Sequence, residues 1–154
     1  MSLDIAAKDG LNSDYSVCTT FIVIDKHFYL VDLMRGRFEY PELKRRVLAL
    51  AERHKPTAIL IEDASAGISL AQEMRAMGQF RVKPVPVEHD KVTRLYVQTA
   101  KFEAGLVHFP KDAPFMPDLL AELLAFPHGK HDDQVDSITQ ALAYKLSTYT
   151  LDNI

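Results

Sequence analysis

Carboxylates crowd the segment HDDQVDS near the end of the chain, where Asp132, Asp133 and Asp136 fall within five positions. One or two acids stabilise the start of a helix, because they cap its free N–H groups and complement its dipole. The third acid is unfavourable on these grounds, since Asp136 follows the other two at spacings where like charges repel by roughly a few tenths of a kcal/mol. The excess of charge therefore indicates a role beyond capping.

Further acids lie in two segments with the character of strands. Asp4 is in the short apolar segment MSLDIA, and Glu62 and Asp63 end the apolar run TAILIED. A strand reached by a crossover returns beside an earlier strand of the same sheet, so we expect Asp4 and Glu62 to lie side by side. Adjacent strand residues face opposite ways, so we expect Asp63 to point elsewhere and to cap the next helix.

Carboxylates held close together raise one another's pKa unless a cation lies between them. Oxygen ligands without a His or Cys spacing favour Mg²⁺ or Mn²⁺ over zinc. Two such ions would activate a water and stabilise the leaving oxygen in phosphodiester hydrolysis. Simpler interpretations exist for each piece: Asp4 as a surface acid, and the pairs 62–63 and 132–133 as helix caps. Taken together, the acids favour a metal site.

The elements that position these acids alternate between strand-like and helix-like segments, which predicts an α/β fold. Hydrophobic periodicity and turn residues place strands at 1–6, 17–24, 28–35, 57–63 and 81–87, the second and third forming a hairpin and the last, rich in proline, at an edge. Helices are expected at 41–55, 65–78, 90–105, 116–126 and 132–147, with a short extended segment at 106–110. We therefore expect a mixed five-stranded sheet, with three antiparallel strands followed by parallel crossovers, flanked by helices.

Composition sets the class of protein. The 154 residues fit one domain, and 47% hydrophobic with 25% charged residues is an ordinary globular balance. A net charge of −3 argues against coating nucleic acid by bulk electrostatics, although a nuclease with a local acidic site is compatible with it. No run is long enough for a membrane helix and the start of the chain has no signal-peptide layout, so we expect an intracellular protein.

Four stretches carry a resemblance to a known family. In order, SLDIAAKDGLNSDYSV, AILIEDASAGISL, VPVEHDKVTRLYVQTAKFEAGLVHFP and HGKHDDQVDSITQALAY resemble the C-terminal nuclease domain of phage terminase large subunits over nearly the whole chain. This implies an RNase H-like fold, similar to Holliday-junction resolvases and integrases. It also implies an endonuclease that cuts concatemeric viral DNA during packaging with two Mg²⁺ or Mn²⁺ ions.

The resemblance also implies roles for individual residues. By position, Asp4 looks like the ligand that bridges both ions, Glu62 the second acid, and Asp133 or Asp132 the third. Asp136 matches a further acid of the resolvase relatives. Lys91 and Arg94, one helical turn apart, are expected to contact DNA phosphates.

The same resemblance bears on context and partners. The sequence has no G-x-x-x-x-G-K-[ST] motif, so we expect residues 1–154 to be a single nuclease domain from a longer protein with an N-terminal packaging ATPase. Expected partners are double-stranded DNA, that ATPase, the small terminase subunit and the portal, in the bacterial cytoplasm as part of a phage or prophage. Two alternatives stay open: a resolvase-like nuclease specific for branched DNA, and a non-catalytic DNA-binding or motor-docking module.

Overall fold

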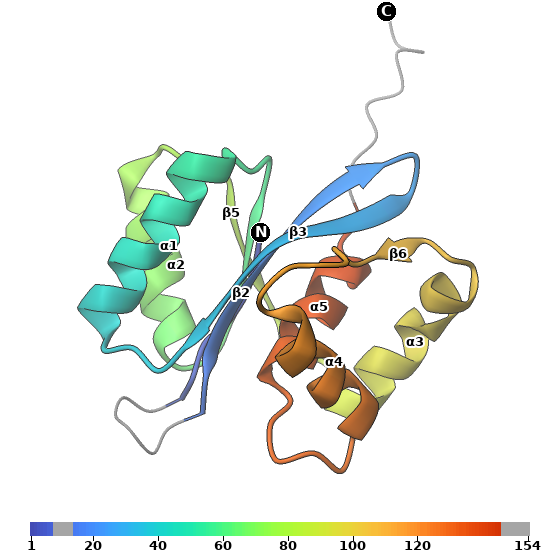
Figure 1. Ribbon diagram of the computed structural model, residues 1–154. Helices are drawn as coiled ribbons and strands as arrows, with labels where there is room; N and C mark the ends of the chain where they lie inside the picture. Colours follow the sequence, from blue (N-terminus) through green and yellow to red (C-terminus); the bar gives the residue numbers. More distant parts are fainter. Residues whose placement is uncertain (8–13, 146–154) are drawn as a thin grey trace, which may run out of the picture.

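A computed structural model describes residues 1–7 and 14–145, and in these residues one six-stranded mixed sheet carries helices on both faces (Figure 1). The strands are β1 (Ser2–Asp4), β2 (Ser16–Ile24), β3 (His27–Gly36), β4 (Ile59–Glu62), β5 (Val82–Val85) and β6 (Val107–His108). The helices are α1 (Tyr40–His54), α2 (Ala66–Met77), α3 (Lys91–Glu103), α4 (Met116–Ala125) and α5 (Asp133–Ala143).

The strand order is β5-β4-β1-β2-β3-β6. The expected hairpin is confirmed: β2 and β3 pair antiparallel through a turn in which Asp25 and Lys26 have φ values of 48° and 70°, as two-residue hairpin turns require. β1 pairs antiparallel with β2 and parallel with β4, and β5 lies at the edge, as its prolines predicted.

The expected count of five strands was wrong by one. β6 comprises only Val107 and His108 and pairs parallel with β3, where Val107 lies opposite Phe28. The sequence shows this segment as merely extended because two residues are too few for an alternating pattern to emerge. The α/β architecture is otherwise as predicted.

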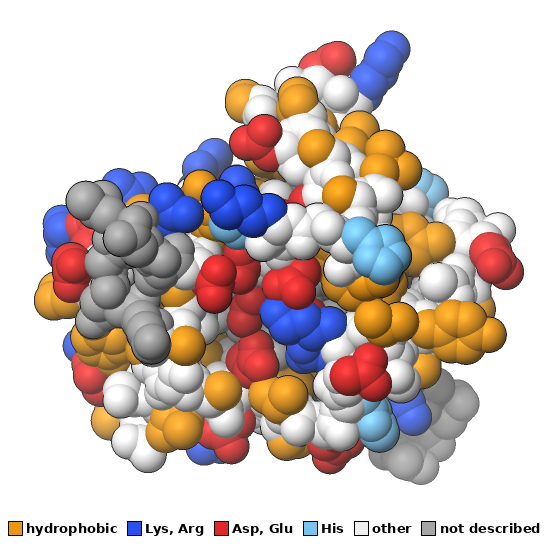
Figure 2. Space-filling model, turned by 90° about the horizontal axis from the view of Figure 1, so that it is seen from below, with side chains coloured by type: hydrophobic (Ala, Val, Ile, Leu, Met, Phe, Trp, Pro, Cys, Tyr) orange, Lys and Arg blue, Asp and Glu red, His pale blue; other side chains and the backbone are white. Residues whose placement is uncertain are grey.

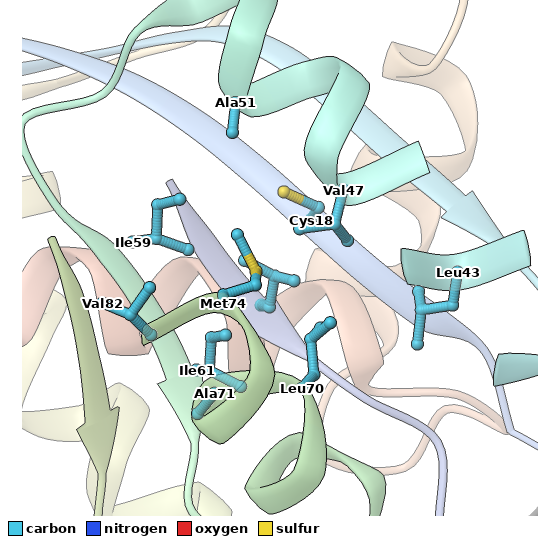
Figure 3. Packing of buried hydrophobic residues seen from close by; sticks show 11 residues of the cluster. Cys18, Leu43, Val47, Ala51, Ile59, Ile61, Leu70, Ala71, Met74 and Val82 are labelled. Atoms are coloured by element: carbon cyan, nitrogen blue, oxygen red, sulfur yellow. The ribbon is translucent and has the colours of Figure 1, made fainter. Parts of the chain in front are cut away.

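Two hydrophobic clusters fill the spaces between the sheet and its helices. α1 and α2 cover one face, and Figure 3 shows their side chains meeting those of the central strands, with Val47, Ile59 and Met74 fully buried. α3, α4 and α5 cover the other face, where Leu119 and Ile138 are also fully buried. No helix in residues 1–7 or 14–145 is long and apolar enough to cross a bilayer.

α5 differs from the other helices because it is buried on nearly every side of its first two turns. All residues from 133 to 139 are buried, both polar and apolar. The helix packs against β1 and β2 and also against α3 and α4. The first two turns of an ordinary surface helix would expose their charges, so the acids of α5 need partners inside the protein.

Candidate metal centre

Asp4 and Glu62 lie side by side at the ends of neighbouring parallel strands. β1 and β4 run in register with Leu3 opposite Ile61, which places the next residue of each strand together and confirms the expected juxtaposition. Burial raises the pKa of Asp4 well above its usual value, and a hydrogen bond with the Glu62 side chain raises it further. Asp133 and Asp136 add to the repulsion on Asp4. Four carboxyl groups from three elements therefore lie in one neighbourhood, where Asp133 and Asp136 are buried and Asp4 and Glu62 are partly buried.

A glycine lets the start of α2 approach Glu62. A Cβ atom at Gly67 would lie 2.3 Å from the backbone oxygen of Glu62 and 3.2 Å from Cγ2 of Ile61. Asp63, by contrast, is exposed. The expected capping role of Asp63 is not seen in the described residues: the residue before α2 is Ser65, and α2 has no side-chain cap hydrogen bond.

A buried network of hydrogen bonds holds α5 against the first two strands. The Ser2 hydroxyl donates to the backbone oxygen of Ser137 at 2.7 Å, and the Ser137 hydroxyl donates to the backbone oxygen of Ser2 at 2.8 Å. The hydroxyls of Thr19 and Ser137 lie 2.8 Å apart, and the Gln140 amide donates to the Ser2 hydroxyl at 2.9 Å. Since Ser137 follows Asp133 by one helical turn, this network fixes the acids of α5 relative to Asp4.

Asp133 is 6% exposed, and its Oδ2 atom has no hydrogen-bond partner among the described residues. Burial raises the pKa of Asp133 to about 6, with further contributions from Asp14, Glu122 and Asp132. A hydrogen bond from the backbone N–H of Tyr15 acts in the opposite direction. An unpaired, buried carboxylate oxygen is costly, and a cation would relieve that cost.

Asp132 and Asp136 already have cationic partners from α3. Lys91 Nζ lies 2.6 Å from Asp132 Oδ1 and 2.8 Å from Asp136 Oδ2, and the Arg94 guanidinium donates to Asp136 Oδ1 at 3.0 Å. Burial raises the pKa of Asp136, while Lys91 and Arg94 lower it. Lys91 and Arg94, predicted to contact DNA, thus lie within the acidic site. Figure 2 shows acidic side chains gathered at the centre of this face with basic side chains against them.

The donor set fits Mg²⁺ or Mn²⁺ in chemistry, because the converging atoms are carboxylate oxygens and one of them is buried without a partner. In the described part of the chain, however, no three His, Cys, Asp or Glu side chains come close enough to form a complete ligand set. Instead, Asp4 pairs with Glu62, Asp133 has one oxygen without a partner among these residues, and Asp132 and Asp136 are in ion pairs. Binding an ion would require Asp133 and the Asp4–Glu62 pair to close around it.

Two features of the site escaped the sequence reasoning. Ser137 and Gln140 fall between apolar residues of α5, a polar stripe that could have signalled contacts inside the protein. Glu122 interrupts the apolar stretch LLAELLA and is 6% exposed. A charged residue on the inner face of a helix is itself a signal, because such residues are almost never fully buried without a partner.

Comparison with known families adds independent evidence. The sequence profile of the family described as "Terminase RNaseH-like domain" matches residues 1–145. The chain belongs to this terminase family. The expected RNase H-like fold of the terminase domain is thereby confirmed, and solved structures support it. A comparison with curated protein sequences gave no match.

Solved terminase nucleases resemble this terminase domain over most of their length. The large terminase nuclease of thermophilic phage G20c with bound zinc is 26% identical, with a TM-score of 0.68 over 91% of this chain and 80% of that chain. The magnesium-bound form of the phage nuclease gives 24% identity and a TM-score of 0.68, covering 92% and 80%. The human cytomegalovirus terminase nuclease domain, soaked with manganese and bound to an inhibitor, is 13% identical, with a TM-score of 0.64 over 90% of this chain and 78% of that chain.

Proposed function

We propose that this terminase domain is a divalent-metal-dependent endodeoxyribonuclease that cuts concatemeric viral DNA during genome packaging. The observation that carries the proposal is the convergence of carboxyl groups, partly buried on β1 and β4 and buried on α5, in a chain of the terminase RNase H-like family. Structures of similar terminase nucleases with magnesium, manganese or zinc support a divalent metal at the site, and the carboxylate ligands favour Mg²⁺ or Mn²⁺.

In this proposal Asp4, Glu62 and Asp133 would hold two Mg²⁺ or Mn²⁺ ions. Asp133 is preferred to Asp132 because it is buried with an unpaired oxygen, whereas Asp132 is 35% exposed in its side chain and paired with Lys91. Asp136, which is buried, and Asp132, which is partly exposed, would complete the site. When bound, the ions would activate water and stabilise charge on the phosphate.

Lys91 is proposed to contact the phosphate backbone of DNA. Its ammonium group has three N–H donors, two of which point to Asp132 and Asp136, and its side chain is 46% exposed. A phosphate at the edge of the site would find the third donor. Arg94 is less exposed, and one of its terminal nitrogens lies against Asp136, so its proposed contact with DNA would use the remaining N–H donors of the guanidinium.

The proposed substrate is double-stranded DNA in the cytoplasm of a bacterium that carries the phage or prophage. A net charge of −3 gives little general attraction to DNA. Efficient cutting would therefore depend on partners that deliver the DNA: a packaging ATPase within a longer protein, the small terminase subunit and the portal.

Plasmid cleavage tests the proposal with matched neighbouring residues. The domain with Mn²⁺ should nick and linearise supercoiled DNA, and EDTA should abolish this. Glu62→Ala and Asp133→Asn should reduce the rate by about a hundredfold or more, whereas Asp63→Ala should cleave within about twofold of wild type because Asp63 is exposed. Equal cleavage by Glu62→Ala and Asp63→Ala would exclude the proposed site.

The same assay separates the two alternatives. A resolvase-like nuclease would cut a four-way junction much faster than a linear duplex of the same sequence, whereas the proposed enzyme would not distinguish them strongly. A solved fowlpox virus resolvase in complex with Holliday-junction DNA shares this fold at 14% identity and a TM-score of 0.56, covering 93% of each chain. A non-catalytic module would bind DNA but would not cut it, whichever metal ion is added.

A further inference from the structure

The helix that carries Asp133 is capped by a residue from a different helix. Asp132 occupies the N-cap position of α5, yet its side chain makes no cap hydrogen bond in the described structure. Instead, Glu122 Oε1 of α4 accepts from the backbone N–H groups of Gln134 at 2.7 Å and Val135 at 3.1 Å. These are the N–H groups at the second and third helical positions, which an N-cap side chain normally satisfies.

Glu122 is held in place by further contacts. Its Oε2 atom accepts from the Gln134 side-chain amide at 2.5 Å, and the Arg35 guanidinium lies 3.9 Å away. Arg35 in turn lies over the ring of Tyr15 at 3.7 Å from its centroid, and the backbone N–H of Tyr15 donates a hydrogen bond to the Asp133 carboxyl group. Glu122 therefore connects α4, β3 and the loop before β2 to the first turn of α5.

A buried carboxylate is an expensive way to fill this position. Its neighbours on the inner face of α4, Met116 and Leu119, belong to the hydrophobic core. A leucine at position 122 would avoid the desolvation of a charge. The two backbone N–H groups would then need another cap, and the residue at the N-cap position is Asp132, which pairs with Lys91.

We propose, resting on the proposed function above, that Glu122 is a positioning residue for the metal site. By capping α5 from α4, it leaves both aspartates at the start of the helix free of the capping role. Asp132 can then pair with Lys91, and Oδ2 of Asp133 stays without a partner in the described residues, close enough for its charge to act on Asp4. Glu122 itself touches neither metal nor DNA in this proposal.

The test compares Glu122→Ala and Glu122→Gln with a matched core variant. The amide oxygen of Gln can still accept from both backbone N–H groups, so Glu122→Gln keeps the cap, whereas Glu122→Ala removes it. Met74→Ala is the control, because Met74 is fully buried in the cluster on the other face of the sheet. It lowers stability without touching α5. Should Glu122→Ala fail to fold, Glu122→Asp replaces it, since the shorter side chain draws the carboxylate back by about 1.5 Å.

Two measurements are made at a temperature where every variant is folded. Titration calorimetry with Mn²⁺ should show a loss of affinity of about 10- to 100-fold for Glu122→Ala, the range for residues that orient metal ligands. Glu122→Gln and Met74→Ala should stay within about threefold of wild type. Amide hydrogen exchange should become faster at Gln134 and Val135 in Glu122→Ala only.

The outcomes separate this inference from the function it rests on. Wild-type Mn²⁺ affinity in Glu122→Ala, with binding lost in Asp4→Ala, would overturn the positioning role and leave the metal site standing. An equal loss of affinity in Glu122→Ala and Met74→Ala would also overturn it, because general destabilisation would then explain both. Absence of Mn²⁺ binding by the wild type would refute the proposed function, while exchange at Gln134 and Val135 would still report on the cap.

Discussion

Replacing Asp133 with Asn is expected to stabilise the metal-free protein at neutral pH while removing its ability to bind metal. The pKa of Asp133 is raised to about 6 from the usual 3.8, chiefly by burial. The folded protein therefore binds this proton more tightly than the unfolded chain does. This tighter binding of the proton contributes most to stability at low pH, and the contribution is lost as the pH rises from about 4 to about 6. Above that window, the folded state holds an ionised carboxylate in an unfavourable place.

The magnitude follows from the two pKa values. At 1.36 kcal/mol for each tenfold change in proton affinity, the difference between about 6 and 3.8 amounts to about 3 kcal/mol at pH 8. Asn has nearly the same shape, stays neutral, and can still accept from the Tyr15 backbone N–H. Asp133→Asn should thus gain about 1 to 3 kcal/mol in free energy of unfolding at pH 8, and little near pH 4, where wild-type Asp133 is already protonated.

Urea unfolding in EDTA at pH 4, 6 and 8 measures this effect. The informative quantity is the change with pH of the difference between variant and wild type, because titrating groups that do not interact with Asp133 cancel in it. Asp63→Asn, at an exposed acid, is the control and should follow wild type at every pH. If Asp133→Asn were less stable than wild type at pH 8, or more stable by the same amount at every pH, the burial argument for Asp133 would be refuted.

Three further predictions concern the surroundings of the site. Gly67→Ala should lower the free energy of unfolding by about 1 to 3 kcal/mol, which thermal unfolding measures. It should also weaken Mn²⁺ binding by displacing the Glu62 backbone, and an unchanged Mn²⁺ affinity in titration calorimetry would contradict this. Ser137→Ala should cost about 1 to 3 kcal/mol by leaving buried groups unpaired, whereas Ser69→Ala, at an exposed position of α2, should cost almost nothing in the same denaturation assay. Lys91→Met should bind Mn²⁺ several-fold more tightly, because a competing cation is removed from Asp132 and Asp136. Its affinity for DNA should fall, and the slope of log DNA affinity against log salt concentration should decrease by about 1. Unchanged Mn²⁺ affinity together with unchanged DNA affinity would argue against a place for Lys91 at the site.

The parts of the site that could be predicted follow from local pattern and topology. Asp4 and Glu62 each end an apolar strand, and the handedness of crossovers makes these strands neighbours; the register of Leu3 with Ile61 bears this out. The hairpin was likewise predicted from two strand-like runs separated by a short break, and the edge position of β5 from the prolines of its segment. Such features depend on residues close together in sequence or on general rules of sheet connection.

The parts that could not be predicted depend on contacts between residues far apart in the chain. The difference between Asp132 and Asp133 is set by Lys91, which is 41 residues away from Asp132, and the cap of α5 comes from Glu122. Helical periodicity distinguishes inner from outer faces only when one face meets water. α5 is enclosed by β1, β2, α3 and α4, so its acids, which a helical wheel places at the surface, are buried.

The arrangement of charges links folding to metal binding. Asp4 and Asp133 both have raised pKa values and no cationic partner in the interactions described, whereas Asp136 has two. A ligand that binds only the folded state adds about 2.7 kcal/mol of stability at a concentration of one hundred times its dissociation constant. At a thousand times the dissociation constant the gain is about 4.1 kcal/mol, which exceeds the penalty of about 3 kcal/mol argued for Asp133. In saturating Mn²⁺ at pH 8, the wild type should therefore become at least as stable as Asp133→Asn, and a variant that stays ahead under those conditions would show that Asp133 does not hold the ion.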